Sequence, residues 1–123
     1  MITGEVTPFR EAVIELTISG PAGSIAVQCV VDTGFTESLI LPPNVVTQLE
    51  LPFVNNMPLV LAGGTEKSFP AHFVWVDWDG EHRRVLVYKA DGDPLVGVGL
   101  LKGFHLGIDW LDGGYVTVSR ITT

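Results

Sequence analysis

The segment VVDTGFTES, which spans residues 30–38, places a carboxylate directly after an apolar run. Asp32 follows three apolar residues and is followed in turn by Thr33 and Gly34, an arrangement that occurs once in the chain. Gly34 permits backbone angles that other residues avoid, and the Thr33 hydroxyl can hydrogen-bond to neighbouring backbone. A carboxylate on such a turn is held rigidly at the end of a buried strand. Taken alone, however, the segment fits better with a plain turn in which Asp32 caps a backbone amide.

The composition predicts one all-β domain. The chain has 123 residues, so a single domain over residues 1–123 is expected. Hydrophobic residues make up 46% and charged residues 17%, which is typical of a globular protein. Fourteen glycines and eight prolines separate short runs rich in valine, isoleucine and aromatic residues. This pattern is typical of strands joined by turns.

Several classes of partner and location are disfavoured. The net charge of −7 argues against nucleic acid or an anionic membrane as the main partner. No apolar run reaches the roughly 18 residues of a membrane-spanning helix, and residues 1–13 do not read as a secretory signal. The single cysteine, Cys29, cannot form an internal disulfide and is expected to be a buried thiol. A cytoplasmic location is the resulting expectation.

The spacing of apolar residues and the turn motifs predict where the individual strands and the short helix lie. Residues 12–19 alternate in the period of two that indicates a half-buried strand. Residues 44–51 predict a short helix behind Pro43, because their apolar positions share one helical face. Asp79-Gly80 predicts a hairpin turn between two strands, and Asp112-Gly113-Gly114 predicts a second one. Strands are expected at residues 12–19, 25–31, 38–42, 57–62, 73–78, 84–88, 104–108 and 115–119.

Two further segments accompany VVDTGFTES. LVLAGGTEKSF, residues 59–69, carries Gly63 and Gly64 near its centre, and PLVGVGLLKGFHLGIDW, residues 94–110, joins an apolar pair and a glycine to a Leu-Leu pair. With these three features in this order, the chain resembles the retropepsin-like aspartic proteases, the single-domain retroviral type of clan AA. The resemblance covers a core from residue 12 to about residue 118, nearly the whole chain.

The resemblance implies a fold and a set of site residues. The fold would be a closed β-barrel or sandwich with a flap hairpin and one or two short helices. Asp32 would be the catalytic residue, on an active-site turn completed by Thr33 and Gly34. The flap would contact substrate through Ala62, Gly63, Gly64 and Thr65. The cleft would be lined by Phe35, Leu59, Leu61, Val96, Gly97 and Val98.

The resemblance also implies a homodimer that cleaves peptides. Two aspartates must share a proton in this chemistry, and the chain supplies one Asp-Thr-Gly. Each subunit would therefore contribute one Asp32 on a two-fold axis, with Thr33 hydrogen-bonding across the subunits. The substrate would be a peptide or protein, and neither a cofactor nor a metal is implied.

The chain departs from the retroviral pattern near the catalytic motif. Phe35 stands where a smaller residue is commoner, and Thr36 and Glu37 replace a pair of acids. Val98 and Gly99 replace an arginine and a small polar residue, so the ionic network of the retroviral dimer cannot be carried over. Residues 1–10 show no clear counterpart of the terminal interface strand. Dimer contacts could instead rest on the flap and the active-site turn.

Two other functions remain open at this point. The same fold could be a catalytically inactive module that binds or scaffolds peptides. A nucleotide hydrolase of the dUTPase kind also has a strand-ending aspartate before an aromatic residue and an acid, but it needs a glycine-rich C-terminal arm, and TVSRITT is not one. GVGLLKG lacks the strand–helix–strand context of a dinucleotide site. The histidines His72, His82 and His105 lack metal-ligand spacing.

Overall fold

The computed structural model describes residues 1–122 and consists mainly of β-structure. A ten-stranded sheet has the order β5-β6-β7-β4-β8-β3-β2-β1-β10-β9 and is accompanied by two short helices. The strands are β1 Ile2–Val6, β2 Ala12–Gly20, β3 Gly23–Val31, β4 Leu39–Leu41, β5 Phe53–Val60, β6 Glu66–Trp78, β7 Glu81–Lys89, β8 Leu95–Val96, β9 Phe104–Ile108 and β10 Tyr115–Arg120. The helices are α1 Pro43–Gln48 and α2 Val98–Leu101.

Part of the sheet closes on itself to form a barrel. Strand β2 pairs with β6 through Ile18↔Val76 and Ser19↔Trp75, which joins the two ends of the run β6-β7-β4-β8-β3-β2. The barrel is mixed, because β3 pairs with β8 and β4 pairs with β7 in parallel while the other pairings are antiparallel. Closure leaves the six-stranded run without free ends, while β5 and β9 remain the edge strands of the whole sheet.

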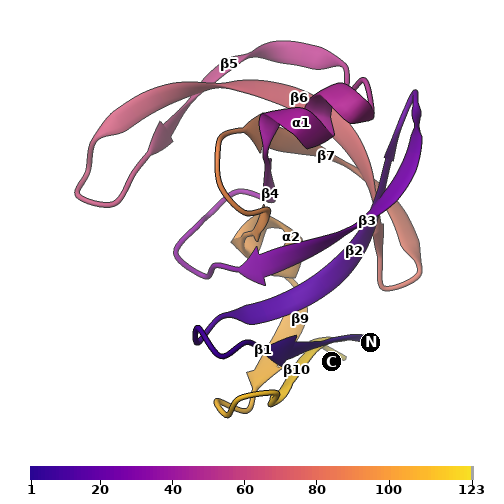
Figure 1. Cartoon of the computed structure of the whole chain (residues 1–123), viewed down its shortest axis with the longest axis vertical. Helices are drawn as coiled ribbons and strands as arrows, with labels where there is room; N and C mark the ends of the chain where they lie inside the picture. Colours follow the sequence, from indigo (N-terminus) through magenta and orange to yellow (C-terminus); the bar gives the residue numbers. More distant parts are fainter. Residues whose placement is uncertain (123) are drawn as a thin grey trace.

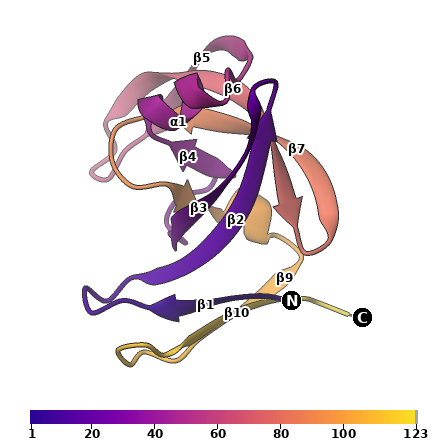
Figure 2. The same ribbon diagram turned by 45° about the vertical axis from the view of Figure 1, so that its right-hand side comes forward.

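Two appendages leave the barrel (Figure 1). The hairpin formed by β5 and the first half of β6 projects well beyond it, and its turn ends over one side of the molecule. At the opposite end, β1 pairs with both β2 and β10, and β10 pairs with β9 (Figure 2). The turn between β3 and β4, which carries Asp32, lies between these two appendages.

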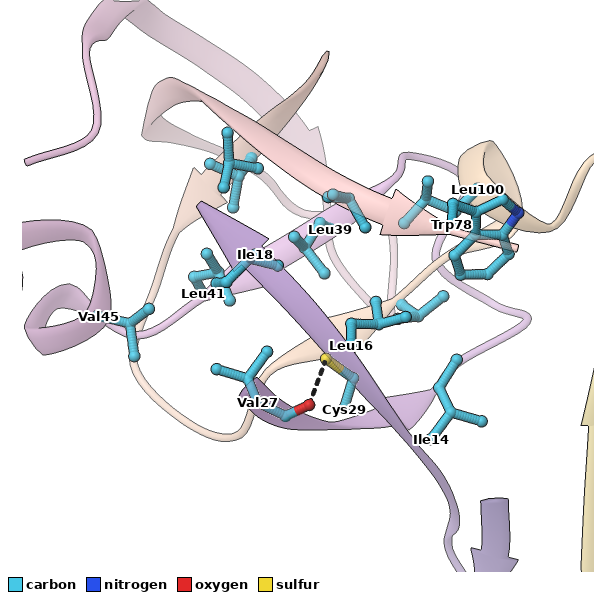
Figure 3. Close-up of a cluster of buried hydrophobic side chains, with 14 of the residues drawn as sticks. Ile14, Leu16, Ile18, Val27, Cys29, Leu39, Leu41, Val45, Trp78 and Leu100 are labelled. Atoms are coloured by element: carbon cyan, nitrogen blue, oxygen red, sulfur yellow. Dashed lines mark hydrogen bonds between the residues drawn. The ribbon is translucent and has the colours of Figure 1, made fainter. Parts of the chain in front are cut away.

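The barrel interior is filled by apolar side chains from alternate strand positions. On β2, Ile14, Leu16 and Ile18 face inward and are buried, while Glu15 and Thr17 are exposed. Figure 3 shows these inward residues packing with Cys29 from β3, Leu39 and Leu41 from β4 and Trp78 from β6. This alternation is the physical basis of the period of two in the sequence.

The fold confirms the predicted all-β architecture, with three differences. All eight predicted strands are present, but the two-residue β8 and strand β1 were not predicted, and β1 extends the sheet beyond the expected core of residues 12–118. Only one of its residues is buried, and it contains Gly4, where a Cβ would clash with the carbonyl oxygen of Val13. The predicted helix over 44–51 ends at Gln48, because Glu50 adopts a left-handed φ of 52°.

Burial of Cys29 leads to a pH prediction. Burial raises the pKa of the Cys29 thiol from 9.0 to about 12, because the interior disfavours the thiolate. The free energy of unfolding should therefore be unaffected by this group below pH 9.0 and fall as the pH rises from there to about 12. Equilibrium unfolding at several pH values should show this slope, reduced in Cys29→Ala. A native thiol that reacts as fast as the unfolded chain with a thiol reagent near neutral pH would contradict the buried placement.

Candidate active site

Asp32 is held by backbone contacts to a strand from the far end of the chain. Strands β3 and β8 run parallel with Val31 opposite Val96, and the Asp32 N–H donates to the Val96 carbonyl at 2.9 Å. The Gly34 N–H donates to Asp32 Oδ1 at 2.9 Å, and the Phe35 N–H donates to the Asp32 carbonyl at 3.2 Å. The half-buried Asp32 is therefore fixed through its backbone by β8 and through its carboxylate by its own turn.

The turn that carries Asp32 crosses the start of α2 at close range. Strand β8 lies between β3 and β4, so the segment that links β3 to β4 must pass over the end of β8. Three hydrogen bonds fasten the crossing: Gly97 N–H to the Ser38 carbonyl at 3.0 Å, Val98 N–H to that of Phe35 at 2.8 Å, and Gly99 N–H to that of Glu37 at 3.0 Å.

Two glycines make this close approach possible. A Cβ at Gly97 would clash with the Glu37 carbonyl oxygen and lie 2.5 Å from that of Phe35. A Cβ at Gly99 would lie 2.7 Å from Ser38 Oγ and 2.9 Å from its backbone nitrogen. Neither position can therefore accept a side chain unless the crossing opens.

A pocket of about 570 Å³ lies between the Asp32 turn and the β5–β6 hairpin. The hairpin turn is closed by the Leu61 N–H, which donates to the Thr65 carbonyl at 2.7 Å, and Gly63 and Gly64 there adopt φ values of 89° and 85°. The pocket is lined by Asp32, Gly34, Phe35, Thr36, Glu37, Ile40, Pro58, Leu59, Val60, Leu61, Ala62 and Leu95. Its walls are mainly apolar, with Asp32 and Glu37 as their two carboxylates.

Some of the residues named from the sequence line this pocket. These lining residues are Asp32, Gly34, Phe35, Leu59, Leu61 and Ala62. The structure places the seven others elsewhere: Thr33, Gly63, Gly64, Thr65, Val96, Gly97 and Val98. Val96 is fully buried in the core, Gly97 lies under the crossing, and Val98 is exposed on α2. Thr33 is exposed on its turn, and Gly63, Gly64 and Thr65 form the exposed tip of the hairpin beyond the pocket.

Other lining residues were not identified from the sequence. They are Thr36, Glu37, Ile40, Pro58, Val60 and Leu95. On β8 the alternation of faces explains the error: Leu95 faces the pocket, so its neighbour Val96 faces the core. The pairing of Leu95 with Ile40 on β4 was the missing information, and periodicity in a two-residue strand cannot supply it.

The environment of the pocket includes a buried tyrosine behind Phe35. The rings of Phe35 and Tyr88 meet edge to face with centroids 6.3 Å apart. Burial, and after it the negative charge of Glu37, raises the pKa of the Tyr88 hydroxyl above its ordinary value of 10.0. Tyr88 therefore stays neutral across the physiological range and supports Phe35 without adding charge.

Comparison with solved structures identifies the architecture. A crystal structure of a retropepsin-like aspartic protease from Rickettsia conorii matches with a TM-score of 0.66 and 16% identity, covering 97% of this chain and 92% of that chain. The chain has the retropepsin-like fold. A structure of EIAV protease complexed with the inhibitor HBY-793 matches with a TM-score of 0.57 and 17% identity, covering 75% of this chain and 86% of that chain.

The retropepsin-like fold is thus established by structure and not by sequence similarity. No protein-family model matches the chain, and neither does any curated protein sequence.

Within residues 1–122, no three His, Cys, Asp or Glu side chains are grouped so that they could hold a metal ion. No helix of that described part is long and apolar enough to cross a membrane.

The crossing can be tested with one added methyl group. Gly97→Ala should destabilise the protein by about 3 kcal/mol or more, because the Cβ meets fixed backbone oxygens that cannot move without opening the Asp32 turn. Val98→Ala is the matched control: it lies next in the chain and removes atoms from an exposed side chain. Equilibrium unfolding of both variants measures the difference. Equal stability of Gly97→Ala and the parent protein would show that the crossing is looser than described.

Proposed function

We propose that this protein is an aspartic endopeptidase that acts as a homodimer. The observation that carries the proposal is the position of Asp32. Its backbone is anchored to β8, and its carboxylate accepts from the Gly34 N–H, lines a largely apolar pocket and lies beneath a projecting hairpin, all within the retropepsin-like fold. A structural turn residue would not need such a pocket, and a carboxylate held this rigidly is suited to chemistry.

The reaction needs two carboxylates that share one proton. Like charges about 3 Å apart cannot both be ionised at low cost, so one of a pair of Asp32 side chains stays protonated. The ionised partner takes a proton from a water molecule, which attacks the peptide carbonyl, while the protonated one polarises the carbonyl oxygen. The second Asp32 would come from a second copy related by a two-fold axis. The exposed Thr33 is accessible for hydrogen bonding to that copy.

The pocket supports an extended peptide as the substrate. Strand β5 and the hairpin turn line the pocket, and a peptide beneath them could form backbone hydrogen bonds as an added strand. Phe35, Ile40 and Leu59 give the lining an apolar character, which favours apolar substrate side chains near the cleaved bond.

The pocket contains two carboxylates, Asp32 and Glu37, so the contribution of each to peptide cleavage can be tested separately. Asp32→Asn keeps the shape of the side chain and should lower peptide cleavage about 10³-fold or more, because the proton-sharing pair is lost. Glu37→Gln is the matched control, since it neutralises the other carboxylate of the same pocket. It should retain most of the activity. Cleavage of a peptide library between about pH 4 and about pH 7 gives both the rates and the cut sites.

Each outcome of this experiment has a distinct meaning. Loss of cleavage in Asp32→Asn alone supports the proposal. Loss of cleavage in both variants would point to a pair formed by Asp32 and Glu37 within one subunit and would contradict a dimeric catalytic centre. If the folded parent protein cleaves no peptide but binds some of them, the inactive peptide-binding module becomes the better account. Equal cleavage by Asp32→Asn and the parent would remove Asp32 from the mechanism.

A further inference from the structure

We propose that two neighbouring turns at the β1–β10 end of the molecule form the docking surface for the second copy, an inference that rests on the proposed function. The surface consists of Phe9 from the β1–β2 turn and Trp110, Leu111 and Tyr115 from the β9–β10 turn and the start of β10. We call it the turn patch. The sequence had suggested the flap and active-site turn as the contact regions, and the turn patch would be the main addition to them.

The end of β1, which leads into the β1–β2 turn, is hydrogen-bonded to the β9–β10 turn, so the two turns start from neighbouring backbone positions. The Val6 N–H donates to the Gly114 carbonyl at 2.9 Å, and the Gly113 N–H donates to the Val6 carbonyl at 2.8 Å. Tyr115 lies opposite Glu5 in the β1–β10 register. The turn patch is therefore fixed to the sheet on both sides and is presented as a unit.

The patch is unusually apolar for a surface that faces water. Phe9 is 85% exposed, Trp110 61%, Leu111 72% and Tyr115 70%. Single exposed apolar residues are ordinary, but a group of large ones is typical of an interaction surface. Tryptophan and tyrosine are also enriched among the residues that dominate binding energy at interfaces.

The position of the patch indicates what covers it. In Figure 1 the β1–β2 turn, the β9–β10 turn, the Asp32 turn and the tip of the hairpin all lie along the left-hand side of the molecule. They remain on one side after the rotation to Figure 2. A second copy that brings its Asp32 turn against this Asp32 turn must approach that same side. The catalytic centre is incomplete without that copy, and the same approach would cover the turn patch.

The strands of this region indicate how the contact is made. Strand β1 uses both of its edges within its own chain, pairing with β2 and β10, and β10 likewise pairs with β1 and β9. Neither β1 nor β10 has a free edge to exchange with a second copy. At this end strand pairing with a second copy is open only to β9, the edge strand of the sheet, so side chains of the turn patch would make the contact at the two turns themselves.

Charge gives the contact a characteristic salt dependence. Each chain carries a net charge of −7, so two copies repel one another at long range. Burial of apolar side chains would have to offset that repulsion. Added salt screens the repulsion and should strengthen the dimer, whereas a dimer held by ion pairs across the interface would weaken.

The experiment compares the oligomeric state of four proteins by sedimentation over about 10 nM to about 100 µM. These are the parent chain, Trp110→Ser, the matched control Trp75→Ser, and Asp32→Asn. Trp75 is also partly exposed but lies on β6 opposite Ser19 of β2, outside the turn patch. Trp110→Ser should raise the dimer dissociation constant about 30-fold or more, while Trp75→Ser and Asp32→Asn should leave it nearly unchanged. Circular dichroism and thermal melting establish that each variant is folded, and Leu111→Ser serves if Trp110→Ser is not.

Several results would overturn the turn patch. A dissociation constant that is the same for the parent, Trp110→Ser and Leu111→Ser would do so, as would a parent that stays monomeric throughout. Weakening of the dimer by added salt would also contradict the apolar contact. Peptide cleavage measured on the same samples separates this proposal from the proposed function. A dimer that cleaves peptides but ignores the patch substitutions overturns the patch alone, whereas a monomer that cleaves them overturns both.

Discussion

The structure depends on one close crossing of the backbone. The turn that carries Asp32 passes over the start of α2, and Gly97 and Gly99 leave room for it by having no side chain. Hydrogen bonds from three successive amides, at residues 97, 98 and 99, hold the two segments together. Because β8 inserts between β3 and β4, residues more than sixty positions apart in sequence fix the orientation of a single carboxylate.

Two other parts of the fold, the barrel and the β5–β6 hairpin, complete the surroundings of Asp32. The closed barrel has a packed apolar interior. The parallel pairing of β3 with β8 fixes the Asp32 turn to this interior. The β5–β6 hairpin supplies a cover with few fixed contacts at its tip, where Gly63 and Gly64 take left-handed angles. This arrangement is compatible with the proposed function, in which the site would admit an extended peptide beneath the hairpin.

Sequence reasoning recovered the features that local pattern encodes. Alternation on β2 and the turn at Asp79-Gly80 follow from short-range chemistry, and Asp32, Gly34, Phe35, Leu59, Leu61 and Ala62 line one pocket in the structure. The features that failed depend on pairing between distant segments. The inward face of Val96 is set by the partners of β8, and the existence of β1 is set by β10, so neither could be read from its own residues. Dimerisation, catalysis and a cytoplasmic location stay predictions.

The measurement that tests the central claim most directly is the activity of mixed subunits. Parent protein is equilibrated with about a tenfold excess of Asp32→Asn chains, so that most parent chains pair with a chain lacking the carboxylate. If one catalytic centre needs an Asp32 from each of two copies, peptide cleavage should fall to about a tenth of that of the parent alone. Glu37→Gln chains added in the same excess should cause no such fall. Cleavage that is unaffected by the Asp32→Asn chains would contradict the account, because each subunit would then carry a complete site of its own.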